Sequence, residues 1–436
     1  MTALNCPALL IAAPASGQGK TTVVAALARL HARLGRRVRV FECGPDYLDS
    51  QIHEIASGQP CHNIDFRLCG EEDARWRLAE AAASADLILI EGVMGLHDGE
   101  PSAAELARRL GVPVLLVIDA GGIAGSFGAI AWGLKHYRDG APISRVLANR
   151  VGSARHGDMC RDTLPEDIAW AGALPREDGA AMPERHLGLL PAAEIADLNA
   201  RLDRMADALL ASAPAMTELP PAVAIAPATP PVLTPLLAGT TIAIARDPAF
   251  CFIYPANVDC LRALGATLVE FSPLRDSTLP PCDAVWLPGG YPELHGPQLA
   301  ANTGMRAALT AHVAAGKPLL AECGGLMACC EELETVAGDV STGFGLLPGR
   351  VTMQKRLSGL GLQAADLPEG RLPAHTFHYS RSDIRGEPLL RATRFNGSEG
   401  EAVWRIGRLT ASYLHFYFPA NPEAVARLFG PAPALG

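Results

Sequence analysis

The segment APASGQGKTT at residues 13–22 has the composition of a phosphate-binding loop. In such a loop, backbone N–H groups surround the phosphates at a helix N-terminus, a lysine reaches the β- and γ-phosphates, and a hydroxyl binds Mg²⁺. The residues predicted to bind nucleotide are Ser16, Gly17, Gly19, Lys20 and Thr21, with Thr21 also a metal ligand. Pro14 stands where the first glycine is usual and offers no N–H, so this fragment alone is also compatible with a glycine-rich turn.

Two acidic segments follow strand-like runs in the same half. LILIEGVMGLHDG places Glu91 at the end of an apolar run and Asp98 in the loop after it, and ECGPDYLDS contains Asp46 and Asp49. Carboxylates at the carboxyl ends of parallel strands line the ligand crevice, so we expect Glu91 to hold Mg²⁺ opposite the phosphate-binding loop. The alternatives are a solvated acid at a strand end and a turn-forming role for Asp46.

A cysteine in the second half has the setting of a nucleophile. In KPLLAECGGLM, Cys323 lies between a strand-like run and a helix-compatible run, as in the elbow that presents a nucleophile at a sharp turn. The helix N-terminus would lower the thiol pKa. The N–H of Gly324 and a second donor from the PGG turn ending at Gly290 would form an oxyanion hole. A cysteine that only packs in the core is the alternative.

The nucleophile needs a general base. His415 lies in the aromatic run TASYLHFYFPANP near the chain end, and a base that follows its nucleophile in the chain suits a dyad at a sheet edge. His375 and His378 in PAHTFHYS are rivals. The residue pattern by itself does not choose among the three.

Two α/β domains must position these residues. Short apolar runs alternate with helical stretches, which predicts parallel sheets covered on both faces. The predicted strands are 8–13, 37–42, 86–91, 113–119 and 145–150 in the first half, and 241–246, 266–271, 284–290 and 317–325 in the second. Predicted helices include 20–35 and 102–111. Seven prolines between Pro214 and Pro235 indicate an extended linker. We therefore expect a domain over 1–212, a linker over 213–239 and a domain over 240–436.

Bulk composition narrows the class of protein. The net charge of −9 argues against a nucleic-acid-binding surface. No apolar run reaches the ~20 residues of a membrane-spanning helix, and the N-terminus lacks the basic start of a signal peptide. Eleven cysteines occur without a CxxC pair, as in proteins whose thiols stay reduced. We expect a cytoplasmic protein with a small-molecule substrate and no nucleic-acid or membrane partner, and a homodimer is compatible with the sequence.

Taken together, seven motifs resemble those of the cobyrinic acid a,c-diamide synthase family. In order they are APASGQGKTT, GPDYLD, LIEGVMGLHDG, LPGGYPELHG, AECGGLM, HTFHYS and SYLHFYF, and the resemblance covers the chain from about Leu9 to Phe418. The resemblance implies a glutamine-dependent amidoligase. Its first domain would be similar to dethiobiotin synthetase, a P-loop relative with an altered loop, and its second would be a flavodoxin-like glutaminase of the triad type.

The resemblance also implies roles for single residues. It assigns ATP and Mg²⁺ to Lys20, Thr21 and Glu91, with Asn149 near the adenine. It assigns the corrin substrate to Asp46, Leu48, Asp49 and Asp98. Cys323 matches the glutaminase nucleophile and His415 its base, which selects among the three histidines.

Several positions depart from the family pattern. Ala13 and Pro14 replace a glycine and a threonine, and Glu42 stands where the family often carries lysine. Triad glutaminases have a glutamate two residues after the histidine, where this chain has Tyr417. The third member of the triad therefore stays unnamed.

The predicted reaction is ATP- and glutamine-dependent amidation of the a- and c-acetate carboxylates of a corrinoid, through an acyl phosphate. Richness in Ala, Arg and Gly suggests a high-GC bacterium and favours metal-free hydrogenobyrinic acid over cobyrinic acid as substrate. A nickel-tetrapyrrole a,c-diamide synthase is an alternative within this class, and cobyric acid synthase fits the motifs less well. An alternative from another class is a P-loop switch or partitioning ATPase with a non-catalytic second domain.

Overall fold

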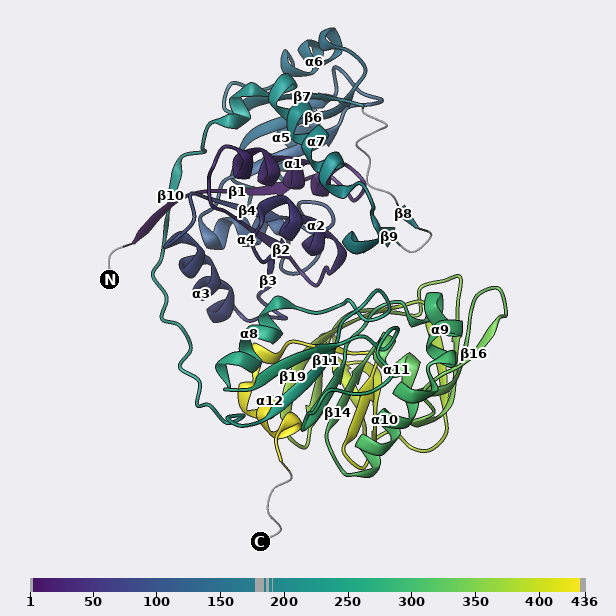
Figure 1. The fold of residues 1–436 in the computed structure, drawn as a ribbon. Coiled ribbons are helices and arrows are strands. Elements are labelled where there is room, and N and C mark those ends of the chain that lie inside the picture. The colour runs from purple at the N-terminus through teal and green to yellow at the C-terminus, as the bar shows by residue number, and fades with distance from the viewer. Residues whose placement is uncertain (1–2, 177–183, 186–187, 190, 432–436) are drawn as a thin grey trace. The chain divides into compact units, whose positions relative to one another are not determined.

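The structure is a computed structural model that describes residues 3–176, 184–185, 188–189 and 191–431 (Figure 1). The chain forms two compact units, Met1–Phe66 with Gly70–Pro230, and Arg67–Cys69 with Pro231–Gly436. The change at Pro230 falls inside the proline-rich segment. Each unit is a sheet flanked by helices, which confirms the predicted α/β class.

The sheet of the first unit has seven parallel strands in the order β3-β2-β4-β1-β5-β6-β7. All five strands predicted for this half are present. The bounds are β1 Leu4–Ala12, β2 Val38–Cys43, β3 His62–Ile64, β4 Leu87–Glu91, β5 Val114–Asp119, β6 Ile143–Val151 and β7 Ala169–Pro175. Because β4 and β5 flank β1, the loops that follow these three strands share one edge of the sheet.

Side chains of β1 alternate between two hydrophobic layers. Leu9 and Ile11 pack on the face covered by α1, α2 and α7, and Leu10 packs on the face covered by α3, α4, α5 and α6. The bounds are α1 Lys20–Arg33, α2 Leu48–Ser57, α3 Glu71–Ala82, α4 Ala103–Leu110, α5 Phe127–His136, α6 Ala154–Arg161 and α7 Leu198–Ser212. Two buried faces explain why these strands are apolar throughout.

Part of the segment predicted as a linker packs on the first unit. Pro214–Thr217 forms a 3₁₀ helix, and β10 (Ala222–Ile225) pairs antiparallel with β1. Arg36 on the chain after α1 donates a hydrogen bond to the carbonyl of Thr217 at 2.7 Å. Residues 226–235 carry neither helix nor strand. The linker bounds of 213 and 239 stay a prediction.

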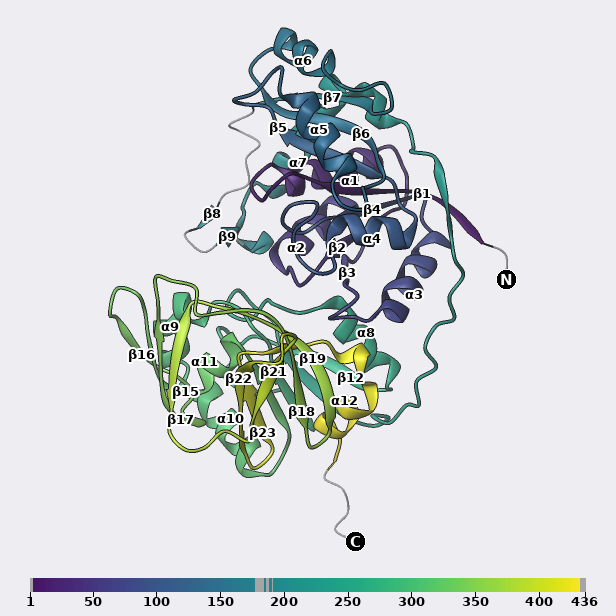
Figure 2. The same ribbon diagram turned by 180° about the vertical axis from the view of Figure 1, so that it is seen from behind.

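In the second unit, the parallel strands follow the order β12-β11-β13-β14-β23, which along the chain is 2-1-3-4-5. This is the flavodoxin-like order, as predicted. The sheet continues through β22-β21-β18-β19-β24 with antiparallel pairing, which was not predicted from the sequence (Figure 2). The bounds are β11 Thr241–Ala245, β12 Thr267–Phe271, β13 Ala284–Leu287, β14 Leu319–Glu322, β18 Gly359–Leu367, β19 Gly370–His378, β21 Leu390–Arg394, β22 Glu399–Ile406, β23 Leu409–Ser412 and β24 His415–Phe416.

Helices cover both faces of the parallel part. Those on one face, around the cluster that contains Leu309, are α9 Gly296–Ala301, α10 Thr303–Ala314 and α11 Gly324–Cys329. Those on the other, around the cluster that contains Trp286, are α8 Pro255–Ala263 and α12 Pro422–Phe429. A separate four-stranded sheet contains β15 Cys330–Glu334, β16 Val340–Thr342, β17 Leu347–Met353 and β20 Ser380–Ile384.

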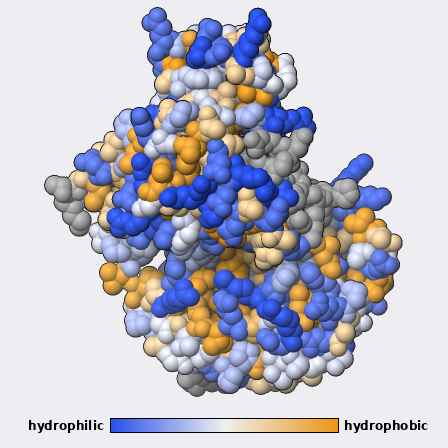
Figure 3. All heavy atoms as spheres, turned by 45° about the horizontal axis from the view of Figure 1, so that its top comes forward, coloured by the Kyte–Doolittle hydropathy of each residue, from blue (hydrophilic) through white to orange (hydrophobic). Residues whose placement is uncertain are grey.

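On the face drawn in Figure 3, hydrophilic and hydrophobic residues are interspersed over both units. Among the described residues, no helix combines the length and the apolar character that crossing a membrane requires.

Candidate functional site

The phosphate-binding loop follows β1, and its last glycine is conformationally constrained. Gly19 has a φ of 91°, in the left-handed region, and α1 begins at the next residue, Lys20. A Cβ added to Gly19 would collide with the side chain of Asn149. Glycine is thus required here both by the backbone and by the close approach of β6.

Side chains at the carboxyl ends of β5 and β6 hold this loop. Asn149 Nδ2 donates to the carbonyl of Gln18 at 2.9 Å, and Arg150 Nη1 donates to the carbonyl of Gly17 at 3.0 Å. Arg150 also pairs with Asp119 Oδ2 at 2.6 Å, and the N–H of Asp119 donates to Gln18 Oε1 at 2.8 Å. Asn149 thus contacts the loop backbone, and Arg150 and Asp119 are site residues that no sequence motif indicated.

Lys20 points into the loop that follows β4. Its ammonium donates to the carbonyl of Met94 at 2.7 Å and lies 3.5 Å from the carbonyl of Ala15. Burial lowers the pKa of Lys20, while Glu91 is the strongest of the acids that oppose this shift. The same loop is shaped by Asp98, whose Oδ2 accepts from the N–H of Gly95 at 3.0 Å.

Thr21 joins two of the predicted acids. Its hydroxyl oxygen lies 2.9 Å from Asp49 Oδ2 and 2.8 Å from Glu91 Oε1. A hydroxyl carries one proton, so it donates to only one of these oxygens. Burial, then the charges of Asp46 and Glu91, raise the pKa of Asp49 well above its usual range. Oxygen donors crowded in this way fit a hard cation such as Mg²⁺.

Asp46 starts α2. Its Oδ1 accepts from the N–H groups of Leu48 and Asp49, both at 2.9 Å. This is the turn-forming geometry that was the alternative for Asp46, and it places Asp49 beside Thr21. Leu48 is partly exposed at the first position of the helix.

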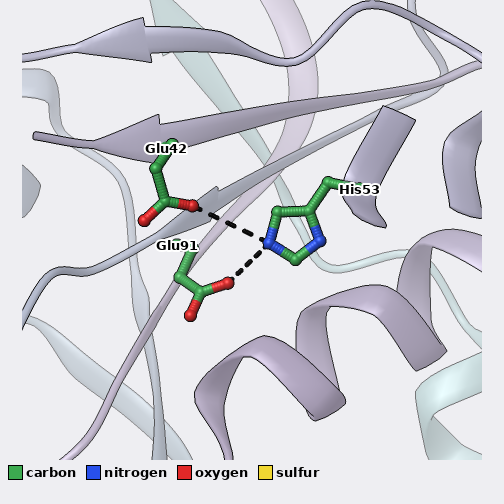
Figure 4. A group of neighbouring side chains, drawn as sticks. All are labelled: Glu42, His53 and Glu91. Atoms are coloured by element: carbon green, nitrogen blue, oxygen red, sulfur yellow. Dashed lines mark hydrogen bonds and ion pairs between the residues drawn. The ribbon is translucent and has the colours of Figure 1, made fainter. Parts of the chain in front are cut away.

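Glu42 and His53 complete this region and were not predicted. Glu42 at the end of β2 is the register partner of Glu91 on β4, so both carboxylates lie on one face of the sheet. His53 on α2 reaches them, with Nε2 2.6 Å from Glu91 Oε2 and 3.7 Å from Glu42 Oε2 (Figure 4). Burial, then the neighbouring Glu91, raise the pKa of Glu42 well above its usual range. The sequence feature that could have indicated Glu42 is its position as an acid at the end of the predicted strand 37–42.

In the second unit, Cys323 occupies the turn between β14 and α11. Its φ of 47° and ψ of −104° are those of a strained residue, and its N–H donates to the carbonyl of Ser412 at 2.7 Å. The side chain is only 4% exposed. Burial, then Glu293, raise the pKa of the Cys323 thiol, whereas the N–H of Gly324 acts in the opposite direction. The thiol is therefore protonated at neutral pH, and its activation requires a base.

Glycines allow close contact between the two predicted oxyanion donors, and between the turn after β13 and the predicted base. A Cβ on Gly324 would lie 2.8 Å from the nitrogen of Gly290, so the two backbones are in close contact. A Cβ on Gly289 would collide with the imidazole of His415. The turn after β13 thus borders both the nucleophile elbow and His415.

His415 lies in β24, three residues beyond the register partner of Glu322, Ser412. Burial, with smaller contributions from His375 and His378, lowers the pKa of His415 to about 3. Glu322 Oε1 accepts a hydrogen bond from the N–H of Phe416 at 2.8 Å. This hydrogen bond links Glu322, which precedes Cys323, to Phe416, which follows His415.

Two comparisons of domains agree with this geometry. Residues 9–189 match the family model of the CobQ/CobB/MinD/ParA nucleotide binding domain, and residues 241–423 match that of the CobB/CobQ-like glutamine amidotransferase domain.

Comparisons with whole proteins are more specific. The chain is 59% identical to hydrogenobyrinate a,c-diamide synthase of Stutzerimonas stutzeri, over 99% of this chain and 100% of the relative. It is 58% identical to the protein of that name from Pseudomonas aeruginosa, over 99% of both chains. It is 46% identical to cobyrinate a,c-diamide synthase of Herminiimonas arsenicoxydans, over 97% of this chain and 96% of the relative. The chain belongs to the a,c-diamide synthase family.

Membership in the a,c-diamide synthase family confirms the resemblance seen in the motifs, including the order of a nucleotide-binding and a glutamine amidotransferase domain. It supports an amidating ligase over a switch or partitioning ATPase.

The two residues that depart from the family pattern, Pro14 and Tyr417, are both closely packed in the structure. The carbonyl of Pro14 would lie 2.6 Å from a Cβ on Gly95, so the two loops pack tightly, and Tyr417 is buried with its ring 5.8 Å from that of Tyr254.

Proposed function

We propose that this chain amidates the a- and c-acetate carboxylates of hydrogenobyrinic acid, with ATP and glutamine as co-substrates. The observation that carries the choice of substrate is the full-length similarity of 59% and 58% to two relatives named hydrogenobyrinate a,c-diamide synthase. The relative named cobyrinate a,c-diamide synthase is less similar, at 46%.

The first unit would activate the carboxylate, which is a poor electrophile because its leaving group would be an oxide. A carboxylate oxygen of the corrinoid attacks the γ-phosphorus of ATP, ADP leaves, and an acyl phosphate forms. Lys20 would exchange the carbonyl of Met94 for phosphate oxygens, which offsets charge in the transition state. The N–H groups of residues 16–21 would bind the phosphates at the start of α1.

Thr21, Asp49 and Glu91 would hold Mg²⁺ in this scheme. All three offer oxygen donors, and the negative charge of the two carboxylates, Asp49 and Glu91, is not balanced by Lys20 alone. Mg²⁺ bound there would offset the charge of the phosphates. Asp49 is thereby proposed as a metal ligand in addition to its predicted contact with the substrate.

The second unit would supply ammonia. The proton of Cys323 passes to His415 as the sulfur attacks the amide carbon of glutamine, with the oxyanion held by the N–H groups of Gly324 and Gly290. His415 returns the proton to the departing ammonia, and water then releases glutamate. Ammonia displaces phosphate from the acyl phosphate to give the amide.

Other expectations stay predictions within this proposal. The corrinoid would meet Asp46, Leu48 and Asp98, and the adenine would lie near Asn149. All eleven cysteines lie in the described part of the chain as thiols outside any disulfide, which supports a cytoplasmic location. A homodimer stays a prediction that light scattering would test.

The test is a mass measurement of the products. The chain is incubated with ATP, Mg²⁺ and glutamine, and with either hydrogenobyrinic or cobyrinic acid. Each amidation replaces OH by NH₂ and lowers the mass by roughly one unit. A product two units lighter from hydrogenobyrinic acid is expected, formed faster than from cobyrinic acid. An unchanged corrinoid would contradict the proposal.

A further inference from the structure

The two oxygens of Glu91 face different groups of donors. Oε1 lies 2.8 Å from the hydroxyl of Thr21, which also contacts Asp49. Oε2 lies 2.6 Å from His53 Nε2, on the side where Glu42 approaches (Figure 4). A carboxylate placed in this way can bridge two cations, as in sites where paired ions lie ~3.5–4 Å apart.

The second group of donors has the composition of a metal site. Glu42, His53 and Glu91 each offer one ligand atom, and the three atoms lie within 4.8 Å of one another. All three residues are buried, and they converge from two adjacent strands and a helix. Two carboxylates and an imidazole suit a divalent cation that takes mainly oxygen ligands and also accepts nitrogen, such as Mn²⁺.

Glu42 provides an independent sign of a missing ligand. Its side chain is 2% exposed, and its Oε2 has no hydrogen-bond partner among the described residues. His53 Nε2 lies 3.7 Å from this oxygen, which is too far for a hydrogen bond. A buried carboxylate oxygen without a partner is costly, and a cation at the centre of the group would satisfy it.

We propose that Glu42, His53 and Glu91 bind a second divalent cation, with the Glu91 carboxylate bridging it to the cation held by Thr21 and Asp49. The inference rests on the proposed function only for the role of the first cation. A second cation at the end of β2 would add positive charge beside the phosphate-binding loop and so help to orient an anionic substrate.

The rival explanation is that His53 only orients Glu91 through a hydrogen bond, with no cation bound. Counting metal ions separates the two. Mn²⁺ is titrated into the full-length protein with a non-hydrolysable ATP analogue and no Mg²⁺, and free Mn²⁺ is measured by electron paramagnetic resonance. We expect two Mn²⁺ per wild-type chain, one for Glu42→Gln, and two for the matched control Glu80→Gln, whose carboxylate pairs with Arg39 at 2.9 Å on the surface.

A single Mn²⁺ on the wild-type chain, or two on Glu42→Gln, would overturn the inference. Glu42→Lys is the second variant, because its ammonium would occupy the cation position and is also expected to leave one Mn²⁺. Pulsed resonance adds a direct readout. Nitrogen modulation from a bound imidazole is expected for the wild type and should vanish in His53→Gln.

Amidation is measured on the same protein by product mass. Two bound Mn²⁺ without any amidation would uphold the second site and contradict the proposed function. Amidation by a chain that binds one Mn²⁺ would uphold the function and overturn the second site.

Discussion

Both candidate sites lie at the carboxyl ends of parallel strands, but one is formed mainly by side chains and the other mainly by backbone groups. The site of the first unit consists of ionisable side chains, in which Lys20 is influenced by several acids, namely Glu42, Asp49, Glu91 and Asp98. The site of the second unit consists mainly of backbone, with Cys323 in a left-handed turn and glycines in close contact around it.

This difference separates two ways of preparing for chemistry. Burial, and after it the neighbouring like charges, raise the pKa values of Glu42 and Asp49 in the first site, and incoming cations and phosphates would complete the electrostatics. In the second site, the fold itself holds the donors at the turn before any ligand arrives. Charge substitutions should therefore damage the first site, and changes of size should damage the second.

The largest effect is expected for Cys323→Ser. Glutamine-dependent amidation should fall by roughly 10⁴-fold or more, because the nucleophile is lost. Amidation with added ammonium salt should persist, since the first unit is unchanged. Cys282→Ser, at a partly exposed cysteine, is the control and should retain both activities. Loss of the ammonium-dependent reaction in Cys323→Ser would contradict separable sites.

Lys20→Met should show the reverse pattern. Amidation should fall by about 10²–10³-fold with either nitrogen source, as expected for loss of one charge-stabilising donor. Glutamine hydrolysis measured alone should change little. Lys135→Met is the matched control. The ammonium of Lys135 forms an ion pair with Asp167 at 2.7 Å and is not part of the phosphate-binding loop. Equal amidation by Lys20→Met and the wild type would remove Lys20 from the site.

Gly324→Ala tests sensitivity to size. The new methyl group would lie 2.8 Å from the nitrogen of Gly290, and overpacking of this kind costs about 1–3 kcal/mol. We expect at least roughly a tenfold loss of glutaminase activity with ammonium-dependent amidation retained. Gly133→Ala, where α5 has open space, should be neutral or stabilising in thermal denaturation. Full glutaminase activity in Gly324→Ala would show that the close contact is not needed.

Arg150→Ala should have a smaller effect in the first unit. It removes one hydrogen bond to the carbonyl of Gly17, worth about 0.5–1.5 kcal/mol. The KM for ATP should rise about two- to tenfold with kcat nearly unchanged. A fall in kcat without a change in KM would mean that Arg150 does more than hold the loop.

The smallest change is expected in a pH profile. The neutral imidazole is the base, and burial lowers the pKa of His415 to about 3, so the base form is present throughout the range from pH 5.5 to 7.5. The kcat/KM for glutamine hydrolysis should lack an acid limb in this range. A histidine with an ordinary pKa of ~6.5 would give roughly a tenfold fall at pH 5.5, and observing that fall would exclude His415 as a buried neutral base.

The predicted strands and the chemistry at their ends were recognisable from local patterns. Apolar runs ending in Glu91 or Cys323 need only neighbouring residues to be seen. The antiparallel strands β18 to β22 were missed because their pairing joins segments far apart, and half-buried strands have weaker apolar runs.

Single side chains around the first site were missed for a related reason. In the sequence, Glu42 is only a departure from the family pattern at the end of the predicted strand 37–42, and His53 belongs to no motif. Arg150 had no motif at all. Their importance depends on what they contact, and those contacts come from other parts of the chain.

The phosphate-binding turn, the cysteine elbow and the family to which the chain belongs could be determined from the sequence alone, because each is recognised from short segments of contiguous residues. The tertiary structure decided which side chains meet. Glu42 lies beside Glu91 only because β2 pairs with β4 in register, and His53 reaches both because α2 packs over those strands. Strand order and register are properties of the whole sheet, so no short segment contains them.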